Sequence, residues 1–312
     1  MKPDILLIEP MTPDVEAQLD AAYIVHRLSQ AKDQMAFIAK VGANIRGIVT
    51  GGRTGASNAI VDALPRLEII AINGIGTDAV DLDLARRRGI HVTTTPDVLT
   101  DDVADMAMAL LLATARHICV GDRVVRTGDW RHGHGVLATK VSGKRLGIIG
   151  LGRVGRAIAR RAEGFDLSIA YSDPQRKADV PYRYQPDLHS LASEVDFLVV
   201  AAAGGAVSRN IVNREVLEAL GPKGILVNVA RGSIVDEEAL VAALIEGRLG
   251  GAGLDVFAHE PDVPEALWRL DNVVLQPHQA SATVETRRAM ADLVLANLAA
   301  HFAGRGLPSA VV

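Results

Sequence analysis

Three ionisable residues, Arg231, Glu260 and His278, each come soon after a short apolar stretch, and their side chains suit one kind of chemistry. Arg231 follows ILVNVA, Glu260 follows GAGLDVF and His278 follows NVVLQP. In an open α/β sheet, ligands bind outside the carboxyl ends of the strands. A guanidinium binds a carboxylate through two parallel hydrogen bonds, and an imidazole exchanges protons near neutral pH. We therefore predict that Arg231 holds a carboxylate and polarises its neighbouring carbonyl, while His278 protonates the carbonyl oxygen during hydride transfer.

Glu260 has a supporting place in this prediction. Bonded to the far nitrogen of the His278 ring, its carboxylate would fix the tautomer and favour the charged form of the ring. Taken singly, the three residues have ordinary explanations as a surface salt bridge, a solvated loop charge and a capping or core histidine. Their joint occurrence on one predicted sheet, which also carries a dinucleotide loop, favours the catalytic interpretation.

The elements that would position these residues are strands of parallel sheets. The β-rich stretches are DILLIEP, YIVHRL, IRGIVTG, LEIIAING and IHVTTTP before residue 97, then RLGIIGLG, LSIAYSD, DFLVVAAA, ILVNVA, GAGLDVF and NVVLQPH. Apolar runs without alternation are typical of strands that are covered on both faces, as in α/β folds. The sequence therefore predicts two doubly wound parallel sheets.

Two long helices are predicted beside the sheets. Residues 100–118 carry acidic residues near their start and basic residues at their end, with Thr100 as the expected N-cap, which predicts one helix that bridges two domains. Residues 286–306 show an amphipathic pattern that ends at a glycine, and no further strand follows NVVLQPH to receive this helix. We expect the second helix to return to the first domain.

A glycine-rich loop, GLGRVG, follows the stretch RLGII and opens a helical pattern. In the pattern G-x-G-x-x-G, Gly150 makes the tight turn, Gly152 lets backbone amides approach a pyrophosphate, and Gly155 lets the helix pack on the strand. We predict that this loop, with Arg153 and Val154, binds a nicotinamide dinucleotide. A plain turn and a loop for flavin or adenosylmethionine are the weaker alternatives.

Asp173 ends the stretch LSIAYSD, about 20 residues after the loop, where a ribose-binding carboxylate is expected. A carboxylate there accepts from the ribose 2'-hydroxyl and repels a 2'-phosphate, which favours NAD(H). Arg176 and Lys177 lie close enough to weaken this preference, so NADP(H) stays open. Ala230, in NVARGS, is also predicted to contact the cofactor.

Ile75 and Gly76 lie in a glycine-bearing loop after the predicted strand LEIIAIN. Its bare amides could cradle the other side of a substrate carboxylate, as backbone nests do. A plain turn would have the same sequence, so both interpretations stand.

Length and composition limit the class of protein. The 312 residues correspond to two domains, and a net charge of −4 with scattered basic residues predicts no nucleic-acid partner. The longest apolar run, MAMALLLATA, is too short to span a bilayer, and the apolar run in MKPDILLIEP is too short for a signal segment. We therefore predict a soluble, cytoplasmic protein without a membrane partner. The single Cys119 excludes an intrachain disulfide and a thiolate metal cluster, its apolar helical surroundings predict a packed thiol, and no metal site is predicted.

The chain resembles the D-isomer-specific 2-hydroxyacid dehydrogenases, and within them the glyoxylate/hydroxypyruvate and hydroxyphenylpyruvate reductases. The resemblance covers essentially the whole chain through TPDVLTDDVAD, SGKRLGIIGLGRVG, ALGPKGILVNVARGSIVDE, GRLGGAGLDVF, HEP, NVVLQPH and SATVETRRAM. It implies a flavodoxin-like substrate domain from residues 1–97 and 286–312, with a Rossmann cofactor domain, residues 98–285, inserted in it. It also implies a homodimer formed largely through the cofactor domains.

The resemblance assigns roles to individual residues. The family's catalytic Arg, Glu and His correspond to the three residues named first. The other positions are the carboxylate-binding loop at Ile75 and Gly76, the nicotinamide-carboxamide acceptor at Asp255, a substrate-site serine at Ser281, and a tryptophan that reaches the partner subunit's pocket at Trp130. Members of this branch that prefer NADP(H) usually carry a small polar residue and then Arg after the second strand, whereas this chain has Asp173 and Pro174. NAD(H) preference is therefore expected, with dual use through Arg153, Arg176 or Lys177 as the alternative.

The expected function is the reduction of small 2-oxo acids, glyoxylate and hydroxypyruvate first, to 2-hydroxy acids. Hydroxyphenylpyruvate is the alternative substrate, although an aromatic content of 4% offers few rings for an aryl group. A third interpretation, a non-enzymatic NAD(H) sensor of the corepressor type, requires a peptide-docking surface or flexible tails, and neither is visible in the sequence.

Overall fold

The computed structural model describes residues 2–133 and 137–312, and it divides into two compact units. The smaller unit contains the chain up to Leu99 together with Thr283–Val312, and the larger unit is Thr100–Ala282. These limits differ from the predicted ones by two residues at the first crossing and three at the second. Each unit is built on one parallel sheet, which confirms the predicted fold class of two parallel-sheet α/β domains.

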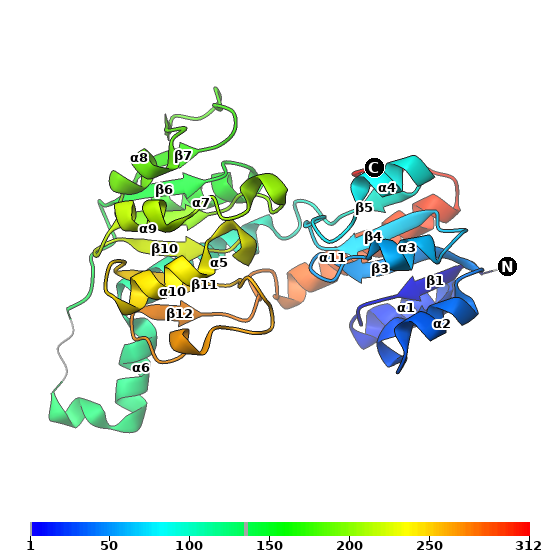
Figure 1. Ribbon diagram of the computed structural model, residues 1–312, viewed down its shortest axis with the longest axis horizontal. Helices are drawn as coiled ribbons and strands as arrows, with labels where there is room; N and C mark the ends of the chain where they lie inside the picture. Colours follow the sequence, from blue (N-terminus) through cyan, green and yellow to red (C-terminus); the bar gives the residue numbers. More distant parts are fainter. Residues whose placement is uncertain (1, 134–136) are drawn as a thin grey trace. The chain divides into compact units, whose positions relative to one another are not determined.

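The smaller unit has a five-stranded sheet in the order β2-β1-β3-β4-β5 (Figure 1). Its strands are β1 (Asp4–Leu7), β2 (Ile24–Arg27), β3 (Ile45–Gly51), β4 (Ile69–Asn73) and β5 (His91–Thr93). Its helices are α1 (Pro13–Ala22), α2 (Gln34–Val41), α3 (Asn58–Asp62), α4 (Leu82–Arg88) and α11 (Val284–Phe302). Side chains alternate between the two faces of a strand, so both faces are buried under helices.

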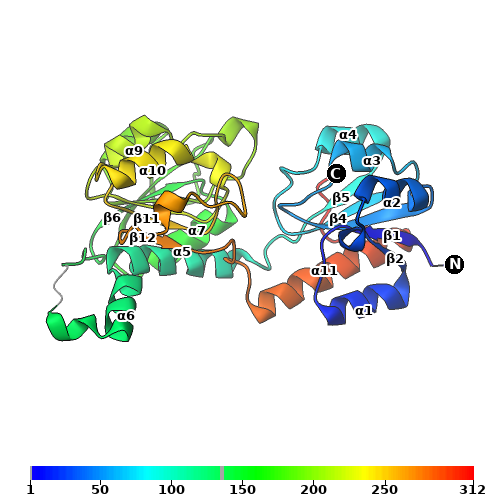
Figure 2. The ribbon, with the colours of Figure 1, turned by 60° about the horizontal axis from the view of Figure 1, so that its bottom comes forward.

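The two faces of this sheet have separate cores. Ile5 and Leu7 of β1 pack with Leu298 of α11 and with residues of α1, whereas Leu6 packs on the opposite face with residues of α2, α3 and α4. Figure 2 shows α1 and α11 together on one side of the sheet. The prediction that the C-terminal helix returns to the first domain is therefore confirmed.

The larger unit has a seven-stranded parallel sheet in the order β12-β11-β10-β9-β6-β7-β8. Its strands are β6 (Arg145–Ile149), β7 (Ser168–Ser172), β8 (Arg183–Tyr184), β9 (Phe197–Val200), β10 (Ile225–Asn228), β11 (Gly251–Leu254) and β12 (Val273–Leu275). Its helices include α5 (Thr100–Ala115), α6 (Ile118–Thr127), α7 (Arg153–Glu163), α8 (Leu188–Ser193), α9 (Arg214–Leu220) and α10 (Glu237–Ile245). The two-residue strand β8 was not predicted, because it is short and polar.

The residues of the predicted helix over 100–118 all belong to the larger unit, where α5 packs against α7 and β11. The observed helix differs from the predicted one in two ways. It ends at Ala115, because His117 adopts a left-handed conformation (φ 52°) and α6 leaves at a bend of 60°. Thr100 is the first helical residue rather than the N-cap, and its buried hydroxyl has no hydrogen-bond partner in the described part of the chain.

Cys119 is exposed, so the prediction of a packed thiol is wrong. The reason is the position of α6, which has no buried residue and projects from the rest of the larger unit (Figures 1 and 2). The apolar pattern that predicted burial continues from α5 into a segment that has no core of its own. In the described chain no single helix is long and apolar enough to cross a membrane, and α5 and α6 would suffice only as a pair despite the bend between them.

Candidate active site

The three predicted catalytic residues follow three neighbouring strands of the larger sheet. Arg231 comes after β10, Glu260 after β11 and His278 after β12, and β11 pairs with both of the other strands. Because these strands are parallel, their carboxyl ends lie along one edge of the sheet. The structure therefore brings the three loops to the same edge.

Glu260 and His278 are in direct contact. The His278 Nδ1 atom lies 2.7 Å from Glu260 Oε2, and the Phe257 amide donates to Glu260 Oε1 at 3.0 Å. An ionised carboxylate only accepts hydrogen bonds, so Nδ1 carries the hydrogen and Nε2 is left for another partner. The side chain of Glu260 is 11% exposed and that of His278 is 34% exposed, so the ring keeps one edge accessible while its support is buried.

Asp255 holds the loop that presents His278. Its two carboxylate oxygens accept from the amides of Gln279 (2.8 Å) and Ala280 (3.0 Å), and its own carbonyl accepts from the His278 amide at 2.8 Å. Asp255 is completely buried, and burial raises the pKa of its carboxyl group. The predicted role of Asp255 as carboxamide acceptor stays a prediction, and it requires this buried carboxylate to become accessible.

Two residues that the sequence did not single out fix the loop of Arg231. The buried Asn228 donates from Nδ2 to the Arg231 carbonyl (2.9 Å) and accepts from the Ala230 amide (3.1 Å). At Gly232, a Cβ atom would lie 1.9 Å from the carbonyl carbon of Phe257, so the Arg231 loop packs tightly on the start of the Glu260 loop. The one signal for Asn228 is a polar residue at the end of the apolar strand ILVN.

The glycine loop has the geometry of a phosphate-binding turn. Gly150 has φ 90°, and a Cβ there would lie 2.6 Å from Ala202 Cα, so only glycine fits this turn. A Cβ at Gly155 would lie 2.1 Å from the Gly150 carbonyl oxygen, where α7 meets the strand. By contrast, nothing lies within 4 Å of a Cβ placed at Gly152, the N-cap of α7. These glycines fit a dinucleotide pyrophosphate at the N-terminus of the helix.

Asp173 lies beside this loop at the end of β7. Its Oδ2 accepts from the Leu151 amide at 3.0 Å, and its Oδ1 lies 2.9 Å from Lys177 Nζ. Partial burial alone would raise the pKa of Asp173, but the hydrogen bonds from Lys177, Gln175 and Leu151 outweigh it and lower the pKa below its usual value. Asp173 is therefore charged and already partly neutralised by Lys177. Pro174 and Arg176 are exposed beside it.

The remaining predicted substrate contacts lie in three places. Ile75 and Gly76 belong to the smaller unit, in the loop after β4, where Gly76 packs against Gly52 of the loop after β3. Ser281 is half-buried in the loop that carries His278. Trp130 lies in the short 3-10 helix Asp129–His132, and it is 67% exposed.

Comparison with known protein families shows which kind of protein uses this arrangement. The family model described as D-isomer specific 2-hydroxyacid dehydrogenase, NAD binding domain, matches residues 108–280. The chain belongs to this family. As a 2-hydroxyacid dehydrogenase it is an enzyme, which confirms the resemblance and the enzymatic interpretation over the corepressor-like one.

Curated relatives of this dehydrogenase match it over nearly their whole length. It is 51% identical to the hydroxyphenylpyruvate reductase of Plectranthus scutellarioides, with 99% of this chain and 98% of the relative covered. It is 48% identical to glyoxylate/hydroxypyruvate reductase A of Arabidopsis thaliana, with 99% of this chain and 98% of the relative covered. It is 45% identical to the 2-ketogluconate reductase of Gluconobacter oxydans strain 621H, with 100% and 99% covered.

Solved structures of dehydrogenases share the fold. The 2-hydroxyacid dehydrogenase of Ketogulonicigenium vulgare Y25 is similar with a TM-score of 0.93 and 50% identity, covering 100% of this chain and 99% of that one. The NADPH-dependent glyoxylate/hydroxypyruvate reductase of Sinorhizobium meliloti, solved with NADP and malonate, gives a TM-score of 0.91 and 42% identity, covering 100% and 97%.

Proposed function

We propose that this dehydrogenase reduces small 2-oxo acids to 2-hydroxy acids with a reduced nicotinamide cofactor, and that glyoxylate and hydroxypyruvate are its substrates. The observation that carries the proposal is the His278–Glu260 contact at 2.7 Å, on the sheet edge that also bears Arg231 and the glycine loop. Relatives named glyoxylate/hydroxypyruvate reductase support the choice of substrates.

Other substrates follow from the other relatives. The relative named hydroxyphenylpyruvate reductase makes hydroxyphenylpyruvate the second candidate. The relative named 2-ketogluconate reductase extends the candidates to hydroxylated 2-oxo acids. All of these acids carry a carboxylate beside the carbonyl that is reduced, which is the pair of groups that Arg231 and His278 suit.

Arg231, His278 and Glu260 have different roles in the proposed reduction. The cofactor, when bound, supplies the hydride to the carbonyl carbon. Arg231 binds the substrate carboxylate through two hydrogen bonds and orients the carbonyl. Nε2 of His278 donates a proton to the carbonyl oxygen, and Glu260, bonded to Nδ1, stabilises the ring while it is charged. Backbone amides at Ile75 and Gly76, and the side chains of Ser281 and Trp130, complete the proposed substrate contacts.

The larger unit is proposed to be the cofactor domain and the smaller unit the substrate domain, with limits near 97/98 and 285/286. The proposed cofactor contacts are Gly150, Gly152, Arg153, Val154, Gly155, Asp173, Ala230 and Asp255. The open space above Gly152 supports this assignment, because a pyrophosphate needs close approach to the backbone there.

NAD(H) is the proposed coenzyme, because the Asp173 carboxylate would accept from the ribose 2'-hydroxyl and repel a 2'-phosphate. Its contact with Lys177 weakens the repulsion, so some use of NADP(H) is expected. We expect Asp173→Ser to lower kcat/KM with NADH and raise it with NADPH, and Lys177→Ala to shift the ratio further toward NADH. Steady-state kinetics with both coenzymes measures the ratio. A wild-type preference for NADPH would overturn the assignment.

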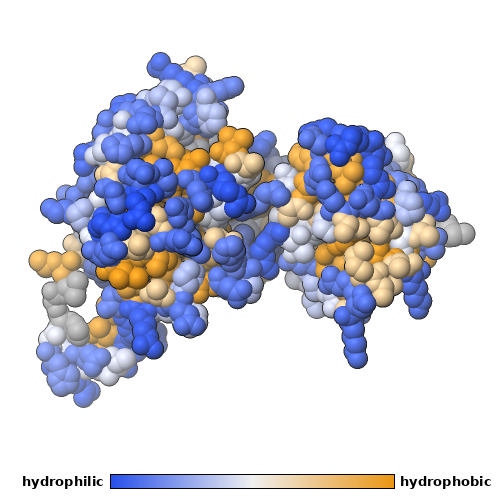
Figure 3. Space-filling view, viewed as in Figure 1, coloured by the Kyte–Doolittle hydropathy of each residue, from blue (hydrophilic) through white to orange (hydrophobic). Residues whose placement is uncertain are grey.

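We also propose that the enzyme works in the cytoplasm as a homodimer, without nucleic acid or membrane as a partner. The support for the dimer is α6, which buries none of its own residues and exposes Ile118 and Val125, followed by the exposed Trp130. Figure 3 shows apolar residues among the hydrophilic ones on this projecting segment. The net charge of −4 disfavours binding to nucleic acid.

Absorbance at 340 nm tests the proposed reaction. Purified enzyme is mixed with NADH or NADPH and one of glyoxylate, hydroxypyruvate, hydroxyphenylpyruvate or 2-ketogluconate. We expect turnover of many equivalents, with glyoxylate or hydroxypyruvate giving the highest kcat/KM. Oxidation of no more than one equivalent with every acid would refute the proposal, and hydroxyphenylpyruvate as the best substrate would select the second candidate.

A further inference from the structure

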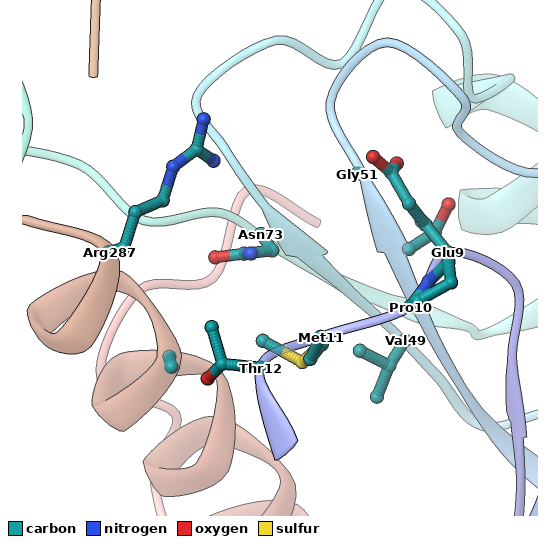
Figure 4. Close-up of a pocket in the computed structure, with 10 residues that line it drawn as sticks. Glu9, Pro10, Met11, Thr12, Val49, Gly51, Asn73 and Arg287 are labelled. Atoms are coloured by element: carbon teal, nitrogen blue, oxygen red, sulfur yellow. The ribbon is translucent and has the colours of Figure 1, made fainter. Parts of the chain in front are cut away.

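The smaller unit contains a cavity of about 400 Å³ that none of the proposed catalytic residues lines (Figure 4). Its lining residues are Glu9, Pro10, Met11, Thr12, Val49, Thr50, Gly51, Asn73, Arg287 and Ala291. They come from the ends of β1, β3 and β4 and from the first turns of α11. The volume is within the range of about 300–1,000 Å³ that is usual for small-molecule sites.

The cavity lies at the carboxyl ends of β1 and β3, a place where α/β sheets commonly bind ligands. The sheet order is β2-β1-β3-β4-β5, so the chain reverses its direction of winding between β1 and β3. Residues 9–12 follow β1, and residues 49–51 end β3. Ligands of open parallel sheets bind outside the carboxyl ends of the strands at such a switch point. The cavity therefore lies where this topology favours a binding site.

Arg287 gives the cavity a cation. It is half-buried, and its guanidinium has no hydrogen-bond or ion-pair partner among residues 2–133 and 137–312. The next residue, Arg288, instead forms ion pairs with Asp14 and Asp292, both at 3.3 Å. The guanidinium donors of Arg287 are therefore available to a ligand that enters the cavity. Arg287 is therefore suited to hold an anionic group.

Hydrogen-bond acceptors lie across the cavity from this cation. In Figure 4, Arg287 is on one side, Glu9 is on the other, and Asn73 lies between them. The Oδ1 atom of Asn73 is buried without a hydrogen-bond partner in the described chain. The Glu9 carboxylate, which accepts from Thr54 at 2.8 Å, lies against Gly51, where a Cβ would be 1.9 Å from Oε2. These oxygens can accept hydrogen bonds from hydroxyl groups of a ligand. The negative charge of Glu9 disfavours a ligand with a second carboxylate.

We propose that this cavity binds a small carboxylic acid that carries several hydroxyl groups, with its carboxylate on Arg287 and its hydroxyls on Asn73 and Glu9. A monocarboxylic acid has one carboxylate, and the carboxylate of the reacting acid is assigned above to Arg231. The ligand of this cavity is therefore an acid that binds without being reduced, and its binding does not depend on the proposed function.

Isothermal titration of the full-length protein with D-gluconate tests the site, with hexanoate as the carboxylate of equal chain length that lacks hydroxyl groups. We expect D-gluconate to bind at least ten-fold more tightly than hexanoate. Arg287→Gln should weaken D-gluconate binding by about 10- to 100-fold, the usual effect of losing a charge-assisted hydrogen bond. Arg287→Lys should lose less, and the neighbouring control Arg288→Gln should bind as the wild type does.

The outcomes separate this proposal from the proposed function. Absence of D-gluconate binding, equal affinity for hexanoate, or a change of less than two-fold in a folded Arg287→Gln variant would overturn the site. Wild-type affinity for D-gluconate is expected in Arg231→Gln, whereas loss of binding in that variant would overturn the proposal by assigning the acid to the proposed catalytic residues. The proposed function is tested independently by NADH oxidation with glyoxylate in the wild-type protein.

Discussion

His278 has a backbone conformation that residues with side chains seldom adopt, since its φ of 54° lies in the left-handed region. That conformation costs about 1–2 kcal/mol for a residue other than glycine. The hydrogen bonds through Asp255 and the contact with Glu260 hold it there and offset this cost. The protein thus maintains an unfavourable local geometry at the residue to which we assign the proton transfer, as is often found at functional sites.

Replacing this residue separates chemistry from structure. We expect His278→Ala to lower kcat for glyoxylate by about 10²- to 10⁴-fold, the usual contribution of a general acid. Binding of NADH and the melting temperature should stay close to the wild-type values. The control is His189→Ala, on an exposed position of α8, which should leave kcat unchanged. Wild-type kcat in His278→Ala would remove the proposed role.

The glycine loop illustrates how one element meets two requirements, folding and ligand binding. Gly155 is required by the packing of α7 on the strand, because a Cβ there would overlap the Gly150 carbonyl oxygen. Gly152 is not required by packing, because the space above it is open. The sequence motif is the same for both glycines, and only the three-dimensional surroundings show which requirement each one meets.

Two alanine substitutions test this difference. Gly155→Ala should destabilise the protein by about 1–3 kcal/mol through overpacking, visible as a lower melting temperature. Gly152→Ala should leave the melting temperature within about one degree and weaken NADH binding, because the methyl group occupies the approach to the pyrophosphate. Thermal unfolding without cofactor and fluorescence titration with NADH measure the two effects. Unchanged NADH affinity in Gly152→Ala would place the pyrophosphate elsewhere.

Prediction from sequence succeeded where the signal was local. Strand stretches, the glycine motif and the polar residues after strands are all contiguous in the chain, and their arrangement on two parallel sheets followed from them. The bend at His117 and the exposure of Cys119 were not predictable, because apolar residues resume after Arg116 and His117 and the sequence does not show that α6 has no core to pack against. Thr100 is a residue type typical of an N-cap, and only the structure shows that it is already helical.

The residues that support the site could not be assigned that role from the sequence. Gly232 packs on the backbone of Phe257, and Asp255, which was expected only as a cofactor contact, accepts from the amides of Gln279 and Ala280, all more than 20 residues away. Such contacts depend on which strands are neighbours in the sheet, and no residue type at a given spacing reports that.

At the scale of the whole molecule, ion pairs of the two units make stability depend on pH. Glu68 accepts from Arg46 at 2.7 and 2.8 Å, and Asp196 accepts from Arg145 at 3.0 Å. These contacts lower the pKa of both carboxyl groups below their usual values, as hydrogen bonds lower that of Asp173. At pH values near and below the ordinary pKa of these carboxyl groups, the unfolded chain therefore binds more protons than the native protein.

Stability should consequently fall on acidification. The contribution of these carboxylates is fully present above their ordinary pKa values of 3.8 and 4.5, and it is lost as the pH falls through the lower values of the folded state. Asp255, with a raised pKa, acts in the opposite sense. Melting temperatures between pH 7 and pH 3 should decrease, and Asp196→Asn should show a weaker decrease. A melting temperature that is constant from pH 5 to pH 3 would contradict this account.

Synthesis from the first residue to the last imposes an order on folding, because α11 covers one face of a sheet whose strands all lie before Leu99. The larger unit is continuous and can close its core as soon as it has left the ribosome. The 183 residues from Thr100 to Ala282 take about 10 to 40 s to translate at about 5–20 residues per second. During that interval the apolar face formed by Ile5, Leu7 and Ile69 has no helix α11 to cover it. Chaperones that shield exposed apolar surface would therefore be needed most by the amino-terminal part of the nascent chain, although it is made first.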